Sequence, residues 1–265
     1  GLSSFNSDSI AKHISVVASD EFMGRKPFTE GETKTIHYLQ QSFMQMGLEP
    51  GNGTSYFQEV PMVNITATAD SFATCYTKTD SFSLQSPGDY VAWTDKTNSS
   101  QSFNKDELVF AGYGVVAPEY NWNDYAGIDV RGKIVLVLVN DPGFNAGDTG
   151  LFKGRAMTWY GRWPYKFAEA ARQGAKGCFI IHSDNAAGYP FSVPQAVWNT
   201  SRLRLDEKDT TEKLCDMIGW IRKDAVLQIF KNAGKDTALL AQADKPGFKA
   251  AALGVRISTS LQVQT

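Results

Sequence analysis

The stretch that decides the fold is Lys133-Ile-Val-Leu-Val-Leu-Val139, which a second apolar run, Gly177-Cys-Phe-Ile-Ile-His182, follows after a gap. Short runs of continuously apolar residues are typical of strands that are buried on both faces of a sheet. Between the two runs, residues 165–173 have the apolar spacing of a helix, and Gly174 is placed to end it. Strand, helix and strand in this order predict a crossover between two parallel strands, and therefore an α/β fold.

Residues 1–60 have the spacing of two amphipathic helices. Ser7 or Asp8 is expected to cap the first helix, because the side chains of both can accept hydrogen bonds from the first free N–H groups. Thr29–Glu32 has the spacing of a capping box, which predicts the start of the second helix. Gly47 is placed to end that helix with a left-handed residue.

The rest of the chain favours strands. Residues 56–110 are rich in Thr, Ser, Val and Phe and are interrupted by Gly and Pro, which predicts several short strands. The polar segment Lys96–Lys105 is expected to be a loop. Near the end, Val255, Ile257, Thr259, Leu261 and Val263 alternate with more polar residues, which predicts a half-buried strand.

The composition narrows the classes of function. The 265 residues are 42% hydrophobic and 12% aromatic, which is enough for a sizeable core and unlike a disordered chain. Lys and Arg number 26 against 28 Asp and Glu, so the net charge of −2 gives no overall attraction to nucleic acid or to an anionic membrane. No apolar run approaches the roughly 20 residues that a membrane span needs. We therefore expect neither nucleic-acid binding nor membrane insertion.

The residues that could bind a metal are few. The chain has three histidines, His13, His37 and His182, without a HExxH or His-x-Asp motif, and three cysteines without a CxxC pair. A zinc site needs three or four converging ligands, so we predict no metal-binding and no catalytic residues in this chain. An odd number of cysteines excludes a disulfide framework but leaves one bridge open.

Two further motifs contain the residue types of a known site, but the neighbouring sequence does not fit that site. His182-Ser183-Asp184 contains the residue types of a hydrolytic triad, but neighbours in sequence are not expected to face one another as triad members do. A hydrolase built on His182 and Ser183 stays open as an alternative. Gly112–Ala117 fits a dinucleotide-binding pattern, yet Pro118 follows and no helix is predicted there, so its glycines are expected to serve turns or close contacts.

One stretch mixes cations with aromatic residues. Between Leu151 and Arg172 the chain has five Lys or Arg residues, one acid, and four Trp or Tyr residues. Such a mixture can hold a carboxylate or the end of a peptide by charge-assisted hydrogen bonds and stacking. The candidate substrate-binding residues are Arg155, Tyr160, Arg162 and Lys166. The alternative is a loop whose aromatic residues pack on the core while its charges stay solvated.

The order of several motifs resembles that of a known family. Ala18-Ser-Asp-Glu-Phe-Met-Gly-Arg25 and Gly47-Leu-Glu-Pro50 resemble the opening of bacterial zinc aminopeptidases, a family that includes glutamate carboxypeptidase II and the transferrin receptor. Val109-Phe-Ala-Gly-Tyr-Gly114 and Val130-Arg-Gly-Lys-Ile-Val135 look like the protease-associated domain inserted in many of those enzymes. The resemblance covers nearly the whole chain.

The resemblance implies a domain organisation. Residues 1–62 would be an N-terminal helical segment of the peptidase domain, and residues 63–254 a β-rich protease-associated insert with a βαβ unit. Residues 255–265 would be a strand that returns towards the peptidase domain. The family's zinc ligands lie downstream of the insert and have no counterpart here. No cofactor is therefore expected in this chain, and zinc is expected in the missing peptidase domain.

The function implied is that of a non-catalytic part of a zinc metallo-aminopeptidase, which shapes substrate access or protein interaction. The alternative is a stand-alone protein-binding module without enzymatic activity, because the transferrin receptor has this architecture and no catalysis. Expected partners are a peptide or protein substrate and the absent peptidase domain. The helices of residues 1–62 either fold back on the insert or pair with a second copy as a homodimer. Enzymes of this family are commonly exported, so the resemblance implies a periplasmic, cell-surface or secreted location.

Overall fold

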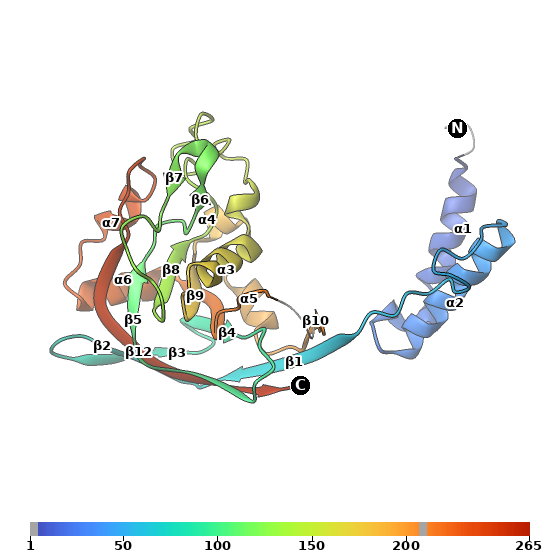
Figure 1. Ribbon diagram of the computed structural model, residues 1–265, viewed down its shortest axis with the longest axis horizontal. Coiled ribbons are helices and arrows are strands. Elements are labelled where there is room, and N and C mark those ends of the chain that lie inside the picture. Colours follow the sequence, from blue (N-terminus) through green and yellow to red (C-terminus); the bar gives the residue numbers. More distant parts are fainter. Residues whose placement is uncertain (1–4, 207–210) are drawn as a thin grey trace. The chain divides into compact units, whose positions relative to one another are not determined.

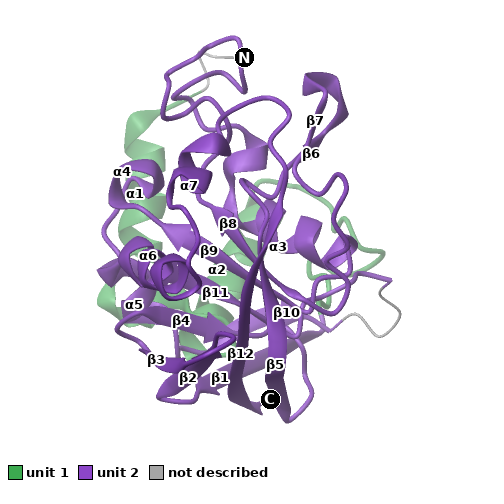
Figure 2. Cartoon of the chain, turned by 90° about the vertical axis from the view of Figure 1, so that its left-hand side faces the viewer, with its two compact units in different colours: residues 1–60 green, residues 61–265 purple. Residues whose placement is uncertain are grey.

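The computed structural model describes residues 5–206 and 211–265. The chain divides into two compact units, residues 1–60 and residues 61–265, which Figure 2 shows in different colours. The larger unit combines a large mixed sheet with helices, so the predicted α/β class is confirmed at this level. Its assignment to a protease-associated domain stays a prediction. Within the described ranges, no helix is long and apolar enough to cross a membrane.

The smaller unit is helical, as predicted. Its elements are α1 (Ser7–Val17), the 3-10 helix η2 (Asp20–Arg25) and α2 (Glu30–Gln45). The cap of α1 corrects the prediction. Asn6 occupies the N-cap, and its Oδ1 accepts hydrogen bonds from the backbone N–H groups of Asp8 at 2.8 Å and Ser9 at 3.2 Å. Ser7 and Asp8 already lie inside the helix, where a side chain can no longer cap the first turn.

The predicted capping box at α2 forms in part. Thr29 is the N-cap, but its hydroxyl donates to the Lys26 carbonyl and does not accept from the helix. Glu32 reaches back to the N–H of Phe28 at 2.5 Å, one residue before the position that a capping box uses. Gly47 has φ +74° and ends the helix, as predicted.

Ten strands in the described residues form one mixed sheet in the larger unit. They are β1 (Met62–Ala69), β2 (Phe72–Tyr76), β3 (Ser81–Gln85), β4 (Tyr90–Trp93), β5 (Ser100–Phe110), β8 (Ile134–Leu138), β9 (Gly177–His182), β10 (Arg202–Leu205), β11 (Met217–Arg222) and β12 (Ala251–Gln264). The strand order is β10-β1-β12-β5-β8-β9-β11-β4, and β2 pairs with β12 and β3. Strands β5, β8, β9 and β11 are parallel, and the pairs around them are antiparallel.

The predicted strand–helix–strand unit is confirmed. Strands β8 and β9 pair in parallel, and α3 (Trp163–Arg172) connects them (Figure 1). Side chains of β8 alternate between two apolar clusters, so both faces of the strand are buried. Helix α3 belongs to the cluster on one face, and α6 (Lys223–Asn232) belongs to the cluster on the other. Gly174 follows α3 with φ +84°, as its position predicts.

The alternating strand near the end is confirmed as β12, and all five of its predicted inward residues are buried. It pairs with β5, whose first residue is Ser100, so the second half of the predicted loop Lys96–Lys105 is wrong. That segment is polar in sequence, but Gln101 and Phe103 alternate inwards against β12 and are buried. Residues 255–265 thus pair within this sheet, and their path towards a peptidase domain stays a prediction.

Gly112 and Gly114 lie in a turn, with φ +54° and +63°. A Cβ at Gly112 would stand 2.8 Å from the ring of Phe248, and one at Gly114 would stand 2.6 Å from Val137. The glycines therefore permit a close approach, as predicted. The short elements that complete the unit are β6 (Val116–Ala117), η3 (Pro118–Tyr120), β7 (Trp122–Asn123), η4 (Trp159–Gly161), α4 (Asp184–Ala187), α5 (Ser192–Val197) and α7 (Ala238–Gln242).

Candidate functional site

The structure separates the four predicted substrate-binding residues. Arg155 and Arg162 are exposed, Tyr160 is half-buried, and Lys166 is 0% exposed. The Tyr160 hydroxyl donates to Glu119 Oε1 at 2.6 Å. In the described part of the chain, no side-chain hydrogen bond or ion pair joins any two of the four. Lys166 thus lies inside the protein and not on the predicted surface.

Lys166 is buried because two backbone carbonyls replace its water. Its Nζ donates to the carbonyl oxygens of Tyr113 and Asn140, both at 2.6 Å. Burial lowers the pKa of Lys166, while the nearby carboxylates of Asp124 and Asp141 oppose this effect. The side chain therefore ties α3 to the turn after β5 and to the end of β8. A charge run in the sequence could not show this, because both carbonyls come from other elements.

Asp124 lies close to the same lysine and is held by three donors. Its carboxylate accepts from the N–H groups of Tyr113 and Val115, each at 3.0 Å, and from Trp122 Nε1 at 2.9 Å. Burial raises the pKa of Asp124, and the hydrogen bonds act in the opposite direction. The carboxylate fixes the turn that contains the two close-contact glycines.

Asp141 anchors the loop that joins β8 to α3. Its Oδ2 accepts from the backbone N–H of Thr158 at 2.8 Å and from the Thr158 hydroxyl at 2.6 Å. Burial raises the pKa of Asp141. Its Oδ1 is buried and has no hydrogen-bond partner among the described residues. The loop that carries Arg155 and Tyr160 is thus held at its base by one carboxylate.

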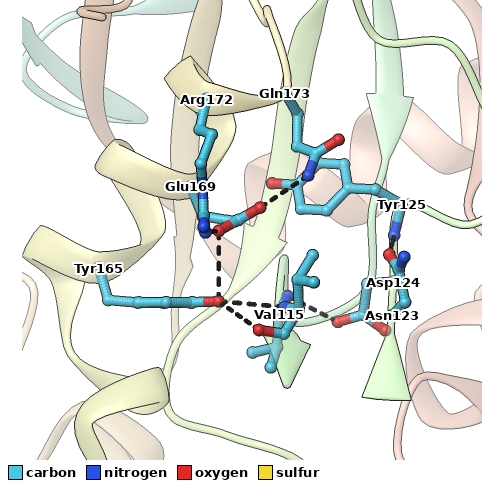
Figure 3. A network of polar contacts seen from close by, with 9 residues as sticks. Val115, Asn123, Asp124, Tyr125, Tyr165, Glu169, Arg172 and Gln173 are labelled. Carbon is cyan, nitrogen blue, oxygen red and sulfur yellow. Dashed lines mark hydrogen bonds and ion pairs between the residues drawn. The ribbon is translucent and has the colours of Figure 1, made fainter. Parts of the chain in front are cut away.

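A second polar network lies on the buried side of α3 (Figure 3). The Tyr165 hydroxyl accepts from the Val116 N–H at 3.0 Å, and it lies 3.1 Å from the Val116 carbonyl and 3.4 Å from Glu169 Oε2. The buried Glu169 also forms an ion pair with Arg172 and accepts from Gln173 Nε2 at 2.7 Å. Satisfied networks of this kind stabilise one arrangement of a core. We read it as a scaffold for α3.

A groove opens beside α3, and we call it the Trp163 groove. Its volume is about 540 Å³. Its lining includes Trp93, Trp163, Phe167, Arg202, Leu214 and Cys215. A smaller hollow of about 200 Å³ shares Trp93, Trp163 and Arg202 with it and adds side chains of α5. The Trp163 groove is the feature of the described structure best suited to take an apolar side chain of a partner.

The floor of the Trp163 groove combines an aromatic ring with a cation. The Cζ of Arg202 lies 4.5 Å from the centroid of the Trp93 ring. The guanidinium donates to the carbonyl of Val197 at 2.9 Å and to that of Trp198 at 3.0 Å, so its hydrogen-bonding capacity is largely used. Trp163 is 49% exposed and forms an aromatic wall. These features favour apolar and aromatic ligands over anions.

The sequence pointed to only part of this groove. Trp163 lies in the stretch of cations and aromatics that was predicted to face substrate. Trp93 and Arg202 come from strands on either side of that stretch and carry no local signal. Their strands, β10 and β4, stand at opposite ends of the strand order, so strand pairing does not bring these two side chains together.

The histidines and cysteines give no metal site in the described residues. Within that part of the chain, no three His, Cys, Asp or Glu side chains are grouped to hold a metal ion. The Nδ1 atom of His13 lies 2.6 Å from the Tyr38 hydroxyl, and that of His37 lies 2.8 Å from the Thr33 carbonyl oxygen. The three cysteines, Cys75, Cys178 and Cys215, are buried and free, so the bridge left open by the sequence is not formed.

Two residues of the segment His182–Asp184 lie close together. His182 Nδ1 lies 3.3 Å from Asp184 Oδ1, because Asp184 begins α4 and turns back towards the end of β9. Among the described hydrogen bonds, none joins Ser183 to His182, so the geometry of a triad is not formed.

No protein-family model and no curated protein matches this chain. Among solved structures, an aminopeptidase from Aneurinibacillus sp. strain AM-1 is similar at 19% identity and a TM-score of 0.37, over 96% of this chain and 43% of its own. A peptidase M28 precursor from Shewanella amazonensis SB2B is similar at 13% identity and a TM-score of 0.29, over 97% and 50%. The chain spans half or less of these two proteins, and likenesses at these TM-scores assign no family.

Proposed function

We propose that this chain is the non-catalytic part of an exported zinc metallo-aminopeptidase. In this proposal, residues 1–60 dock on a peptidase domain outside this sequence, and residues 61–265 shape the access of peptides to it. The zinc ion would belong to that peptidase domain, where it would activate a water molecule. The motifs at residues 18–25 and 109–114 support the proposal. In the structure, one observation carries it, which is the set of exposed apolar side chains on α1 and α2.

The apolar side chains of α1 and α2 are largely exposed. In α2, Ile36, Leu39 and Phe43 follow one face of the helix and are 38%, 42% and 41% exposed. In α1, Ile10 and Ile14 are 49% and 57% exposed. Covering the part of one such side chain that is still exposed is worth about 1 kcal/mol, so a face of this kind favours a partner. A peptidase domain is the partner that the sequence motifs imply.

The deciding experiment measures the hydrolysis of leucine p-nitroanilide. We expect no turnover by this chain, with or without added zinc. We expect zinc-dependent turnover by the protein that the complete gene encodes, and its loss on chelation. Zinc-dependent turnover by this chain alone would contradict a non-catalytic role. Absence of turnover by the complete protein across several peptides would contradict the peptidase assignment.

The Trp163 groove favours a second candidate function, a stand-alone protein-binding module. A module of this kind needs no reactive residues, but it does need an exposed apolar groove. The Trp163 groove is such a groove. It predicts that peptides with an aromatic side chain change the tryptophan fluorescence of this chain in a saturable way. Substitution Trp163→Ala should abolish the saturable change. Binding by the complete protein without any peptidase activity would favour this candidate over the first.

A further inference from the structure

A second hollow lies where two parallel strands end. Strand β9 ends at His182 and β11 at Arg222, and these two residues are paired across the sheet. Phe191, just beyond β9, packs in the cluster on the α3 side, whereas α6, just beyond β11, packs on the opposite face. Chains that leave neighbouring parallel strands towards opposite faces open a crevice at the carboxyl ends. Open α/β sheets bind ligands in such crevices.

This crevice, which we call the β9–β11 hollow, has a volume of about 560 Å³. That lies within the range of about 300–1,000 Å³ that is typical of small-molecule sites. Its lining consists of His182, Ser183, Asp184, Pro190, Phe191, Ser192, Gln195, Arg222, Lys223, Asp224 and Leu227. The lining thus offers cations, carboxylates and apolar side chains together.

The charges of the β9–β11 hollow leave one cation and one anion for a ligand. Arg222 and Asp224 neutralise each other, since the guanidinium donates to both carboxylate oxygens at 3.0 and 2.5 Å. Lys223 is exposed and has no ion-pair partner among the described residues. The Asp184 side chain is 71% exposed, and its near neighbour is the imidazole of His182.

His182 positions Asp184 without neutralising it. The histidine is 3% exposed, and its Nδ1 lies 3.3 Å from Asp184 Oδ1. Burial lowers the pKa of His182, which favours the neutral ring. The ring is packed against the aromatic rings of Tyr189, Phe191 and Trp220, so its place beside Asp184 is fixed.

We propose that the β9–β11 hollow binds a zwitterionic α-amino acid with an apolar side chain. Lys223 would hold the carboxylate and Asp184 the ammonium group, by charge-assisted hydrogen bonds. Phe191 and Leu227 would contact the side chain. The free cation, the free carboxylate and the apolar residues of the lining then each have a counterpart in the ligand. The inference concerns residues outside the Trp163 groove and holds whether or not the complete protein is a peptidase.

The test is an NMR titration of the full chain with L-leucine. The chain has three histidines, so their ring signals are few and can be assigned. We expect the His182 signals to shift in a saturable way and those of His13 and His37 to stay unchanged. Two analogues separate the charges: 4-methylpentanoate lacks the ammonium group, and 3-methylbutylamine lacks the carboxylate. Each should bind about tenfold more weakly or worse, because one charged hydrogen-bonding partner is lost.

Exposed variants complete the test. Asp184→Asn and Lys223→Gln should each weaken L-leucine binding by about tenfold. Lys231→Gln, at the other end of α6, should leave it unchanged, and melting curves verify that all three fold. Absence of a saturable His182 shift at millimolar L-leucine would overturn the proposal. Equal binding of 4-methylpentanoate and L-leucine, with no effect of Asp184→Asn, would show a simple anion site and overturn it too.

Discussion

At the scale of single residues, the most informative position is Lys166, a lysine that is buried without an ion pair to any described residue. Methionine at this position would keep the length of the side chain but leave the carbonyls of Tyr113 and Asn140 without a donor. We expect Lys166→Met to lower the free energy of unfolding by about 2–4 kcal/mol, measured by urea denaturation. The exposed control Lys235→Met should change it by less than about 0.5 kcal/mol. Similar losses in both variants would contradict the role of the two carbonyls.

The same lysine predicts a pH dependence. Burial lowers the pKa of Lys166 from 10.5 to about 7. Between these values the unfolded chain holds a proton at Lys166 that the folded chain does not, so the free energy of unfolding rises as pH rises through this window. Below about pH 7 both states are protonated, so the stability that the folded chain gains at higher pH from a neutral Lys166 is lost. Urea denaturation at several pH values gives the free energy of unfolding as a function of pH. Between about pH 7 and 10.5 this free energy should rise less steeply for Lys166→Met than for the unsubstituted chain. Equal slopes would show that Lys166 stays charged when folded.

At the scale of elements, β11 depends on one small residue. A Cβ at Gly219 would overlap the carbonyl oxygen of Val91 on β4 and stand 2.9 Å from the ring of Phe179 on β9. Both neighbours belong to paired strands and have little room to move. Gly219→Ala should therefore lower the free energy of unfolding by about 1–3 kcal/mol. In the control Gly88→Ala, the nearest atom would be 3.7 Å away, so thermal melting should separate the two variants.

The elements that could be predicted are those whose pattern is local. Three patterns predict their structure from a few neighbouring residues. They are the apolar run at β8, the helix stop at Gly174 and the alternation of apolar and polar residues in β12. The start of β5 at Ser100 could not be read in this way, because the polar residues there become a strand only against β12.

The site was less predictable for the same reason. A lone lysine among other cations looks solvated, and only the carbonyls that fold onto Lys166 make its burial possible. Trp93 and Arg202 come from strands at opposite ends of the strand order, and no motif encodes their contact. The close contacts of Gly112 and Gly114 were predictable, since the residues after them exclude the helix that the rival interpretation requires.

At the scale of the whole molecule, the two units differ in how much they bury. The larger unit has two apolar clusters, one on each face of its parallel strands. In the described part of the smaller unit, only Phe22 and Gly31 are buried. A helical segment with so small a core gains most of its stability from packing on something else. The smaller unit is therefore the feature behind our proposal that this chain works as part of a larger assembly.

This argument predicts the effect of charges on the exposed face of α2. In the protein that the complete gene encodes, the double substitution Leu39→Asp and Phe43→Asp should bury two unpaired carboxylates and lower the melting temperature by about 5 °C or more. In the present chain the same change should have little effect, because this face is already exposed. The control Gln41→Asp, on another face of α2, should leave the melting temperature of both proteins unchanged. An unchanged melting temperature of the complete protein would show that this face is not a docking surface. A loss confined to the present chain would instead show that the face packs within it or against a second copy.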